Sequence, residues 1–150
     1  MKRITIDKGK CSGCRYCELV CSYRENSSFN PRESKIRVLK YDESGIDDPV
    51  VCHQCTLCPP ADACPTQAFQ RGKDGIVRIE DKACTACYAC VSACPHQAVF
   101  RPPTRSPPLV CDLCDGQPLC VKKCPTHVLT FSAVESLLSR PHTVEGGETK

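Results

Sequence analysis

The sequence predicts an α+β fold of two small modules, one inserted into the other, with short strands and helices around cysteine-rich loops. Sixteen of the 150 residues are cysteine, and they fall into four groups of four. Thirteen prolines and eight glycines favour short elements joined by tight turns over long helices. The chain has no tryptophan and 5% aromatic residues, so its apolar interior is thin for this length.

The two ends of the chain are predicted to form the outer module. Arg3–Ile6 is a short β-prone segment before the first cysteine group, and Val128–Phe131 is a similar segment after the last group. Both partly alternate between apolar and polar residues, so we expect them to pair as outer strands. After the first group, a polar loop at Arg24–Lys35 leads into a predicted strand at Ile36–Leu39.

The middle of the chain is predicted to be the inserted module, with a hairpin at its centre. Thr66–Phe69 is followed by a turn at Gly72–Gly75 and an alternating strand at Ile76–Ile79, which is a hairpin pattern. Val50–Val51 and Ala98–Phe100 flank this segment, and we expect them to form the second strand pair of the module.

A proline-rich stretch separates the third and fourth cysteine groups. Residues 101–108 carry four prolines, which cannot donate to a strand ladder, so we predict an extended connector and not a hairpin. The fourth group then lacks a link to the third, which favours a nested arrangement. The predicted boundaries are residues 1–49 plus 101–131 for the outer module, 50–100 for the inserted module and 132–150 for a tail. In the tail, Ser132–Glu135 has capping-box spacing and is predicted to open a short helix, followed by a mobile end.

The spacing of the cysteines indicates their chemistry. The first and third groups are C-x2-C-x2-C-x3-C runs, the pattern that binds iron–sulfur clusters in bacterial ferredoxins, and a proline follows the last cysteine of three groups. Four cubane clusters need sixteen thiolates, the number present. We therefore expect four 4Fe-4S clusters as cofactors, in two ferredoxin-like modules of the βαββαβ type with two clusters each.

Two other uses of so many cysteines are less consistent with the pattern. A secreted disulfide scaffold is disfavoured because cysteines three apart on one tight loop cannot readily pair, and because Met1–Lys10 has no apolar core of a signal peptide. Zinc sites usually take two cysteines from each of two knuckles, not three in a row plus a fourth before proline. We therefore expect a cytoplasmic iron–sulfur protein.

Nested pairing predicts which cysteines bind each cluster, because the fourth cysteine of a ferredoxin run ligates the neighbouring cluster of the pair. The expected ligand sets are Cys11, Cys14, Cys17 and Cys124; Cys21, Cys111, Cys114 and Cys120; Cys52, Cys55, Cys58 and Cys94; and Cys64, Cys84, Cys87 and Cys90. The second group is irregular, with C-x2-C-x2-C-x5-C spacing, so the loop Pro59–Ala63 must bulge. A three-iron cluster or a spare thiol at Cys58 is the alternative.

No catalytic residues of the chain's own are expected. The four histidines have no nucleophile beside them, and no glycine-rich nucleotide fingerprint is present. Tyr16 and Tyr88 lie inside ligand loops and are expected to shield their clusters from water. The net charge of +3 would fall to about −5 with four oxidised clusters bound, so nucleic acid is not an expected partner. The sequence contains no run of about 18 apolar residues, so we do not expect it to insert into a membrane.

The chain resembles the four-cluster ferredoxin-like electron-transfer subunits of molybdenum and tungsten oxidoreductases over about residues 1–131. The resemblance is carried by the four cysteine groups and by Cys11–Cys21 followed by Phe29-Asn30-Pro31 and Lys35–Val38. It is greatest to the small subunits of aldehyde oxidoreductase-type tungsten enzymes, including class II benzoyl-CoA reductases. The same subunit type serves dimethyl sulfoxide reductases, formate dehydrogenases and carbon monoxide dehydrogenase systems.

This resemblance implies two partners: a large tungsten- or molybdenum-pterin catalytic subunit, and a flavin-containing NAD reductase or ferredoxin. The expected function is an electron relay between them, with possible end-to-end contact between further copies of the chain. The alternatives are a free-standing polyferredoxin carrier and a cluster- or zinc-stabilised interaction module without redox function.

Overall fold

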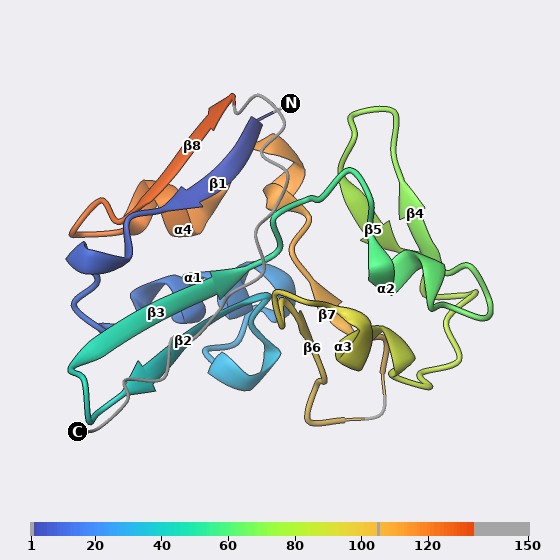
Figure 1. Ribbon diagram of the computed structural model, residues 1–150, viewed down its shortest axis with the longest axis horizontal. Coiled ribbons are helices and arrows are strands. Elements are labelled where there is room, and N and C mark those ends of the chain that lie inside the picture. Colours follow the sequence, from blue (N-terminus) through green and yellow to red (C-terminus); the bar gives the residue numbers. More distant parts are fainter. Residues whose placement is uncertain (1, 105, 134–150) are drawn as a thin grey trace, which may run out of the picture.

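The computed structural model describes residues 2–104 and 106–133, which form a small α+β structure of short strands and helices. The elements in chain order are β1 (Lys2–Ile6), η1 (Lys8–Lys10), α1 (Tyr16–Asn26), η2 (Pro31–Glu33), β2 (Ile36–Tyr41), β3 (Ile46–Val51), α2 (Pro59–Asp62), β4 (Phe69–Arg71), β5 (Val77–Ile79), α3 (Ala89–Ala93), β6 (Val99–Phe100), β7 (Leu109–Val110), η3 (Leu113–Gly116), α4 (Leu119–Lys123) and β8 (Leu129–Ala133). In Figure 1, β1, β8, α1, α4, β2 and β3 lie on one side of the molecule, and α2, α3 and β4–β7 lie on the other. In the described part of the chain, no helix is long and apolar enough to cross a membrane.

The two ends of the described chain pair as antiparallel strands, as predicted. In β1 and β8, Ile4 is opposite Phe131 and Thr5 is opposite Thr130. The two threonine hydroxyls lie 2.6 Å apart on the outer face, while Ile4 faces the core and is 5% exposed. Polar residues outside and apolar residues inside fix the register of this pair.

The central hairpin is also confirmed. Phe69 in β4 is opposite Ile79 in β5. The turn between them is closed by Gly75, whose φ is 77°, and by an Asp74 carboxylate that accepts a hydrogen bond from the amide of Ile76 at 3.0 Å. Asparagine, aspartate and glycine favour such turns for these reasons.

The predicted pairing of Val50–Val51 with Ala98–Phe100 is wrong. β3 pairs with β2, where Ile36 is opposite Val51, and β6 pairs with β7, where Val99 is opposite Val110. The turn between β2 and β3 is short and contains Gly45 at φ 65°, so a local hairpin closes with less loss of chain entropy than a distant pairing.

The prolines of residues 101–108 do not prevent a strand pair, contrary to the prediction. They lie in the loop between β6 and β7, so no ladder hydrogen bond is lost. Two further boundaries differ. α1 extends to Asn26 and η2 occupies Pro31–Glu33, so the polar loop is shorter than expected. Ser132 and Ala133 belong to β8, and the rest of the predicted helix and tail lies outside the described residues.

Cysteines take the place of the missing aromatic residues in the core. The larger buried cluster combines aliphatic residues such as Ile36, Val51 and Leu129 with Cys111 and Cys120, and it also includes Ile76, which precedes β5. A smaller cluster consists of Cys90, Val99 and Val110. Because cysteines belong to both buried clusters, a change in cysteine chemistry also changes the packing of the core.

Candidate metal centre

Three small cavities inside the structure are each bordered by four cysteines. The three sets are Cys11, Cys14, Cys17 and Cys124; Cys21, Cys111, Cys114 and Cys120; and Cys52, Cys55, Cys58 and Cys94. These groupings coincide with three of the ligand sets expected from the sequence. We call them the first, second and third cysteine sets.

The remaining four cysteines form a fourth set around Cys90. The pKa of Cys90 is raised to about 11, mainly by burial and also by the nearby thiols of Cys64, Cys84 and Cys87. Among the described residues, no three His, Cys, Asp or Glu side chains are close enough to hold a single metal ion. In the first three sets the four cysteines border a common cavity.

The irregular second group does place Cys58 beside its expected partners. Cys58 borders the same cavity as Cys52 and Cys94, and it is the residue before α2. The extra residues of this group form the single turn of α2, which begins with two prolines at positions that need no donated hydrogen bond. The predicted bulge at Pro59–Ala63 is therefore a helical turn.

Two helices each carry cysteines to two neighbouring cavities. In α1, Cys17 borders the first cavity and Cys21, one turn later, borders the second. In α4, Cys120 borders the second cavity, and Cys124 at the helix end borders the first. The two helices pack against each other, so the first and second sets are joined into one unit.

The loops that begin each cysteine group share one backbone geometry. The second residue after the first cysteine has a left-handed backbone in all four groups: φ is 62° at Gly13, 54° at Gln54, 51° at Ala86 and 57° at Leu113. In the last three, the amide of that residue donates to the cysteine sulfur at 3.4 Å. Such N–H···S bonds stabilise thiolates in iron–sulfur proteins.

A Cβ atom at Gly13 would also lie 2.4 Å from the carboxylate of Asp47, so a larger residue there would force that side chain to move.

A second repeated geometry follows the last cysteine of three groups. Gln67, Gln97 and His127, three residues after Cys64, Cys94 and Cys124, all have φ of 51–52°. The amides of Ala68 and Ala98 then donate to the preceding cysteine sulfurs at 3.3 and 3.4 Å.

Threonine hydroxyls complete two of these loops. Thr66 lies 3.6 Å from the Cys64 sulfur, and Thr126 lies 3.7 Å from the Cys124 sulfur. Although burial acts in the opposite direction, these hydroxyls and backbone amides lower the pKa of both cysteines. Sequence reasoning missed the two threonines, although the repeated Cys-Pro-Thr triplet was a signal for them.

Several other thiols have a raised pKa, because they lie partly or fully away from water. Burial raises the pKa of Cys17, Cys52 and Cys120 to about 12, and it raises the pKa of Cys111 as well. Sulfur must lose its proton to bind metal, so the bound metal has to supply the free energy of deprotonation. Buried thiols with amide donors aimed at them are a donor set suited to iron–sulfur clusters.

A charged network lies beside the second cysteine set. The Lys35 ammonium is 2.6 Å from Glu25 and 2.9 Å from Asp112, and its backbone amide donates to the Cys21 sulfur at 3.3 Å. All three charged residues border the cavity of this set. The network extends to Asp115, whose carboxylate lies 2.8 Å from the guanidinium group of Arg78 in β5.

A buried glutamine links the second and third sets. The Gln54 side chain is 0% exposed, donates to the carbonyl oxygen of Cys111 at 2.5 Å and accepts from the amide of Val77 at 2.7 Å. The Cys52 thiol also lies close enough to Cys111 to raise its pKa, after the larger effect of burial. Sequence reasoning did not identify Gln54, because its partners are distant in the chain.

The aromatic residues near the loops have different surroundings. Tyr16 is 43% exposed, whereas the Tyr88 hydroxyl donates to the carbonyl oxygen of Ser106 at 3.1 Å. His53 and His96 stack with ring centroids 4.3 Å apart and border the cavity of the third set. Both histidines thus lie against a predicted cluster.

Comparisons with known proteins agree with this chemistry. A family described as the 4Fe-4S dicluster domain matches residues 46–134. The polyferredoxin-like subunit of aliphatic sulfonate oxidoreductase from Pyrococcus furiosus is 41% identical over 122 residues, which cover 81% of this chain and 70% of that protein. The electron transport protein HydN of Escherichia coli K12 is 36% identical over 149 residues, with 84% and 85% covered.

A solved structure is also similar. A chain of the active site complex BamBC of benzoyl coenzyme A reductase, in complex with benzoyl-CoA, has a TM-score of 0.55 and 34% identity. The match covers 88% of this chain and 79% of that chain.

Proposed function

We propose that the chain relays electrons through four 4Fe-4S clusters held by its four cysteine sets. It belongs to the 4Fe-4S dicluster domain family and is an iron–sulfur electron-transfer protein related to oxidoreductase subunits. In the proposed relay, one end receives electrons from one partner and the other end passes them to a second partner. Bound clusters would supply the one-electron chemistry, while the protein sets their spacing and surroundings.

The observation that carries this proposal is that the four cysteine sets form a continuous row. α1 and α4 join the first set to the second. The Cys52 and Cys111 thiols bring the second set beside the third. The cysteine run of Cys84–Cys94 joins the third set to the fourth, because Cys90 lies in the fourth and Cys94 borders the third cavity. Because each cysteine set adjoins the next one in the row, electrons could pass between all four bound clusters.

The protein's own groups would hold each cluster and tune it. Backbone amides aimed at sulfur stabilise the more negative, reduced state of a cluster, while the burial of Cys111 and Cys120 disfavours added negative charge. The insertion of one two-cluster module into the other, with outer residues 1–49 and 101–131 and inserted residues 50–100, is part of this proposal. The pairing of β1 with β8 supports it.

We further propose that the catalytic partner is a large subunit with a tungsten- or molybdenum-pterin, of the aldehyde oxidoreductase type. The similarity to a chain of the BamBC active site complex and to a sulfonate oxidoreductase subunit supports a catalytic partner of this general kind. A flavin-containing NAD reductase or ferredoxin is proposed at the other end, and the cytoplasm is the proposed location.

Anaerobic reconstitution tests the number of clusters. Four cubanes require about sixteen iron and sixteen acid-labile sulfide per chain, and reduction with dithionite should produce the paramagnetic signals of several interacting clusters. About eight of each would reduce the row to two clusters, and zinc without sulfide would end the relay proposal.

The partner is tested separately by purification under anaerobic conditions from the native cell. A stable complex with a large polypeptide that contains tungsten or molybdenum, measured by elemental analysis, supports the subunit role. Recovery of the chain alone with all its iron would instead support the free polyferredoxin carrier.

A further inference from the structure

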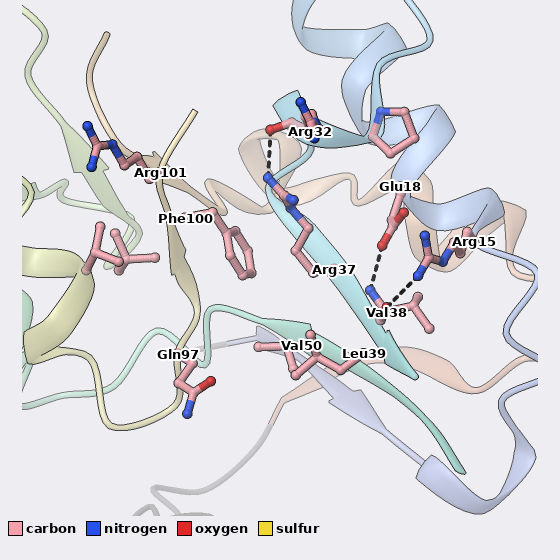
Figure 2. Close-up of a pocket in the computed structure, with 13 residues that line it drawn as sticks. Arg15, Glu18, Arg32, Arg37, Val38, Leu39, Val50, Gln97, Phe100 and Arg101 are labelled. Carbon is pink, nitrogen blue, oxygen red and sulfur yellow. Dashed lines mark hydrogen bonds between the residues drawn. The ribbon is translucent and has the colours of Figure 1, made fainter. Parts of the chain in front are cut away.

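A groove of about 690 Å³ separates the surfaces of the two sides of the molecule, and its walls are rich in arginine. Arg15, Arg32 and Arg37 come from α1, η2 and β2 or lie next to them, whereas Arg101 follows β6 on the opposite wall. Figure 2 shows Arg101 and Arg15 at opposite sides of this space, with Arg37 between them. We call this feature the arginine groove.

The four arginines of the groove lack ion pairs in the part of the chain that the structure describes. Within the described ranges 2–104 and 106–133, none of them makes an ion pair, while Arg24, Lys35 and Arg78 elsewhere each pair with at least two acidic residues. The acidic residue in the wall is Glu18, which is 3% exposed and already accepts a hydrogen bond from the amide of Val38 at 2.6 Å. The groove therefore presents an excess of positive charge to solvent.

The arginines are instead held by neutral groups. Arg37 donates to the carbonyl oxygen of Arg32 at 2.6 Å and lies over the ring of Phe100 at 5.1 Å, and its Nε atom is buried without a partner. Arg101 lies over the ring of Tyr88 at 4.5 Å. These contacts orient the guanidinium groups but leave donors for an incoming anion, and guanidinium is the group best suited to pair with carboxylates.

The groove touches two of the cysteine sets. Arg15 and Val38 line both the groove and the cavity of the first set, and Val99 lines both the groove and the cavity of the third set. Anything seated in the groove thus lies one side chain away from two predicted clusters. The floor between the arginines is apolar and includes Leu39, 36% exposed, and Phe100.

We propose that the arginine groove docks an acidic segment of a redox partner protein, whose carboxylates pair with the arginines on both walls. This inference rests on the proposed electron-transfer function and adds a place of contact to it. Charge complementarity argues for the occupant: four guanidinium groups distributed along the groove match several carboxylates on one extended segment better than they match one compact anion. Docking there brings the partner against the walls of the first and third sets, where electrons can enter or leave.

Binding of a hexaglutamate peptide to the reconstituted holoprotein tests the groove directly. The labelled peptide should bind at low ionic strength, and binding should weaken as salt is added. The double variant Arg32→Glu and Arg101→Glu should lower the affinity by about 100-fold, since each lost charge-assisted pair accounts for about tenfold. Both residues are exposed. Arg32 is remote in sequence from its nearest cysteine, and β6 separates Arg101 from Cys94, so their replacement leaves the cysteine sets intact.

A matched control is Lys2→Glu with Lys73→Glu, which reverses the same number of charges on exposed residues outside the groove and away from the cysteines. This control should retain most of the affinity. Equal loss in both double variants would overturn the proposal, because attraction would then follow net charge alone. Displacement of the peptide by equimolar inorganic phosphate would also overturn it in favour of a site for small anions.

The iron content and the paramagnetic signals after dithionite reduction are measured for every preparation. These measurements distinguish a failure of the relay proposal from a failure of the docking proposal. If clusters fail to assemble in the parent protein, the relay proposal fails whatever the peptide does. If clusters assemble equally in all variants but hexaglutamate does not bind the parent, the docking proposal alone is wrong.

Discussion

Replacement of Gln54 with alanine should loosen the junction between the second and third cysteine sets. The Gln54 side chain is fully buried and makes two hydrogen bonds, to the carbonyl oxygen of Cys111 at 2.5 Å and from the amide of Val77 at 2.7 Å. Alanine removes both partners at once and leaves a carbonyl oxygen and an amide without hydrogen bonds in the interior.

The magnitude follows from these two groups. A buried polar group that loses its partner costs about 1–3 kcal/mol, so the two together destabilise the junction by about 3 kcal/mol or more. At about 1.4 kcal/mol for each factor of ten, local opening should increase about 150-fold. The void left by the side chain adds to this value.

Gln67→Ala is a control with the same backbone and the same chemical change. Gln67 has φ of 52° and Gln54 has φ of 54°, so alanine is equally strained at both positions, but Gln67 is exposed. The difference between the two variants therefore isolates the buried hydrogen bonds.

Hydrogen–deuterium exchange of the holoprotein, followed by mass spectrometry, is the assay. The peptide that contains Val77 should exchange much faster in Gln54→Ala than in the parent, and at the parent rate in Gln67→Ala. Equal exchange of this peptide in the two variants would refute the reasoning, because the hydrogen bonds of Gln54 would then contribute nothing to the junction.

Three further predictions concern the clusters. Lys35→Met removes the positive charge beside the second cysteine set and leaves Glu25 and Asp112 there with Arg24 as their remaining ion-pair partner, so the potential of that cluster should fall by about 60 mV, the one-electron equivalent of about 1.4 kcal/mol, in a redox titration. An unchanged set of potentials would contradict this placement. Cys58→Ala should lower the iron content by about one per chain and alter the paramagnetic signal of the oxidised protein, whereas an unchanged iron content would make Cys58 a spare thiol. Cluster assembly should be more complete at about pH 8.5 than at about pH 6.5, because burial raises the pKa of Cys52 to about 12 and metal must displace its proton; a yield independent of pH would contradict this.

Parts of the fold could be predicted because the determining signals are local. The β4–β5 hairpin follows from Gly72–Gly75 between two alternating segments, and its pairing is as expected. The partner of β3 was mispredicted because Val50–Val51 was treated as a short isolated run. The strand begins at Ile46, and Gly45 at φ 65° returns it to β2.

The candidate site divides in the same way. Cysteine spacing together with the nested pairing of the groups predicts the cysteines that border the three cavities, since the fourth cysteine of a ferredoxin run ligates the neighbouring cluster. Gln54, Lys35 and the arginine groove could not be predicted, because their partners lie far away in sequence and meet only in the folded chain. Arg15, Arg37 and Arg101, for example, are far apart in the sequence but line one space.

The exposure of the cysteines indicates where electrons enter and leave the proposed row. Cys14 and Cys87 are the exposed cysteines, and they belong to the first and fourth sets, at the two ends. Cys111 and Cys120, in the second set, are buried. Burial disfavours the extra negative charge of a reduced cluster, so interior clusters are harder to reduce than clusters near water when other factors are equal. The first and fourth sets therefore each offer a partner an exposed cysteine, and the first also shares a wall with the arginine groove, while the second set lies furthest from solvent. Electrons that enter at one exposed set can pass along the row to the other, as a relay between two proteins requires.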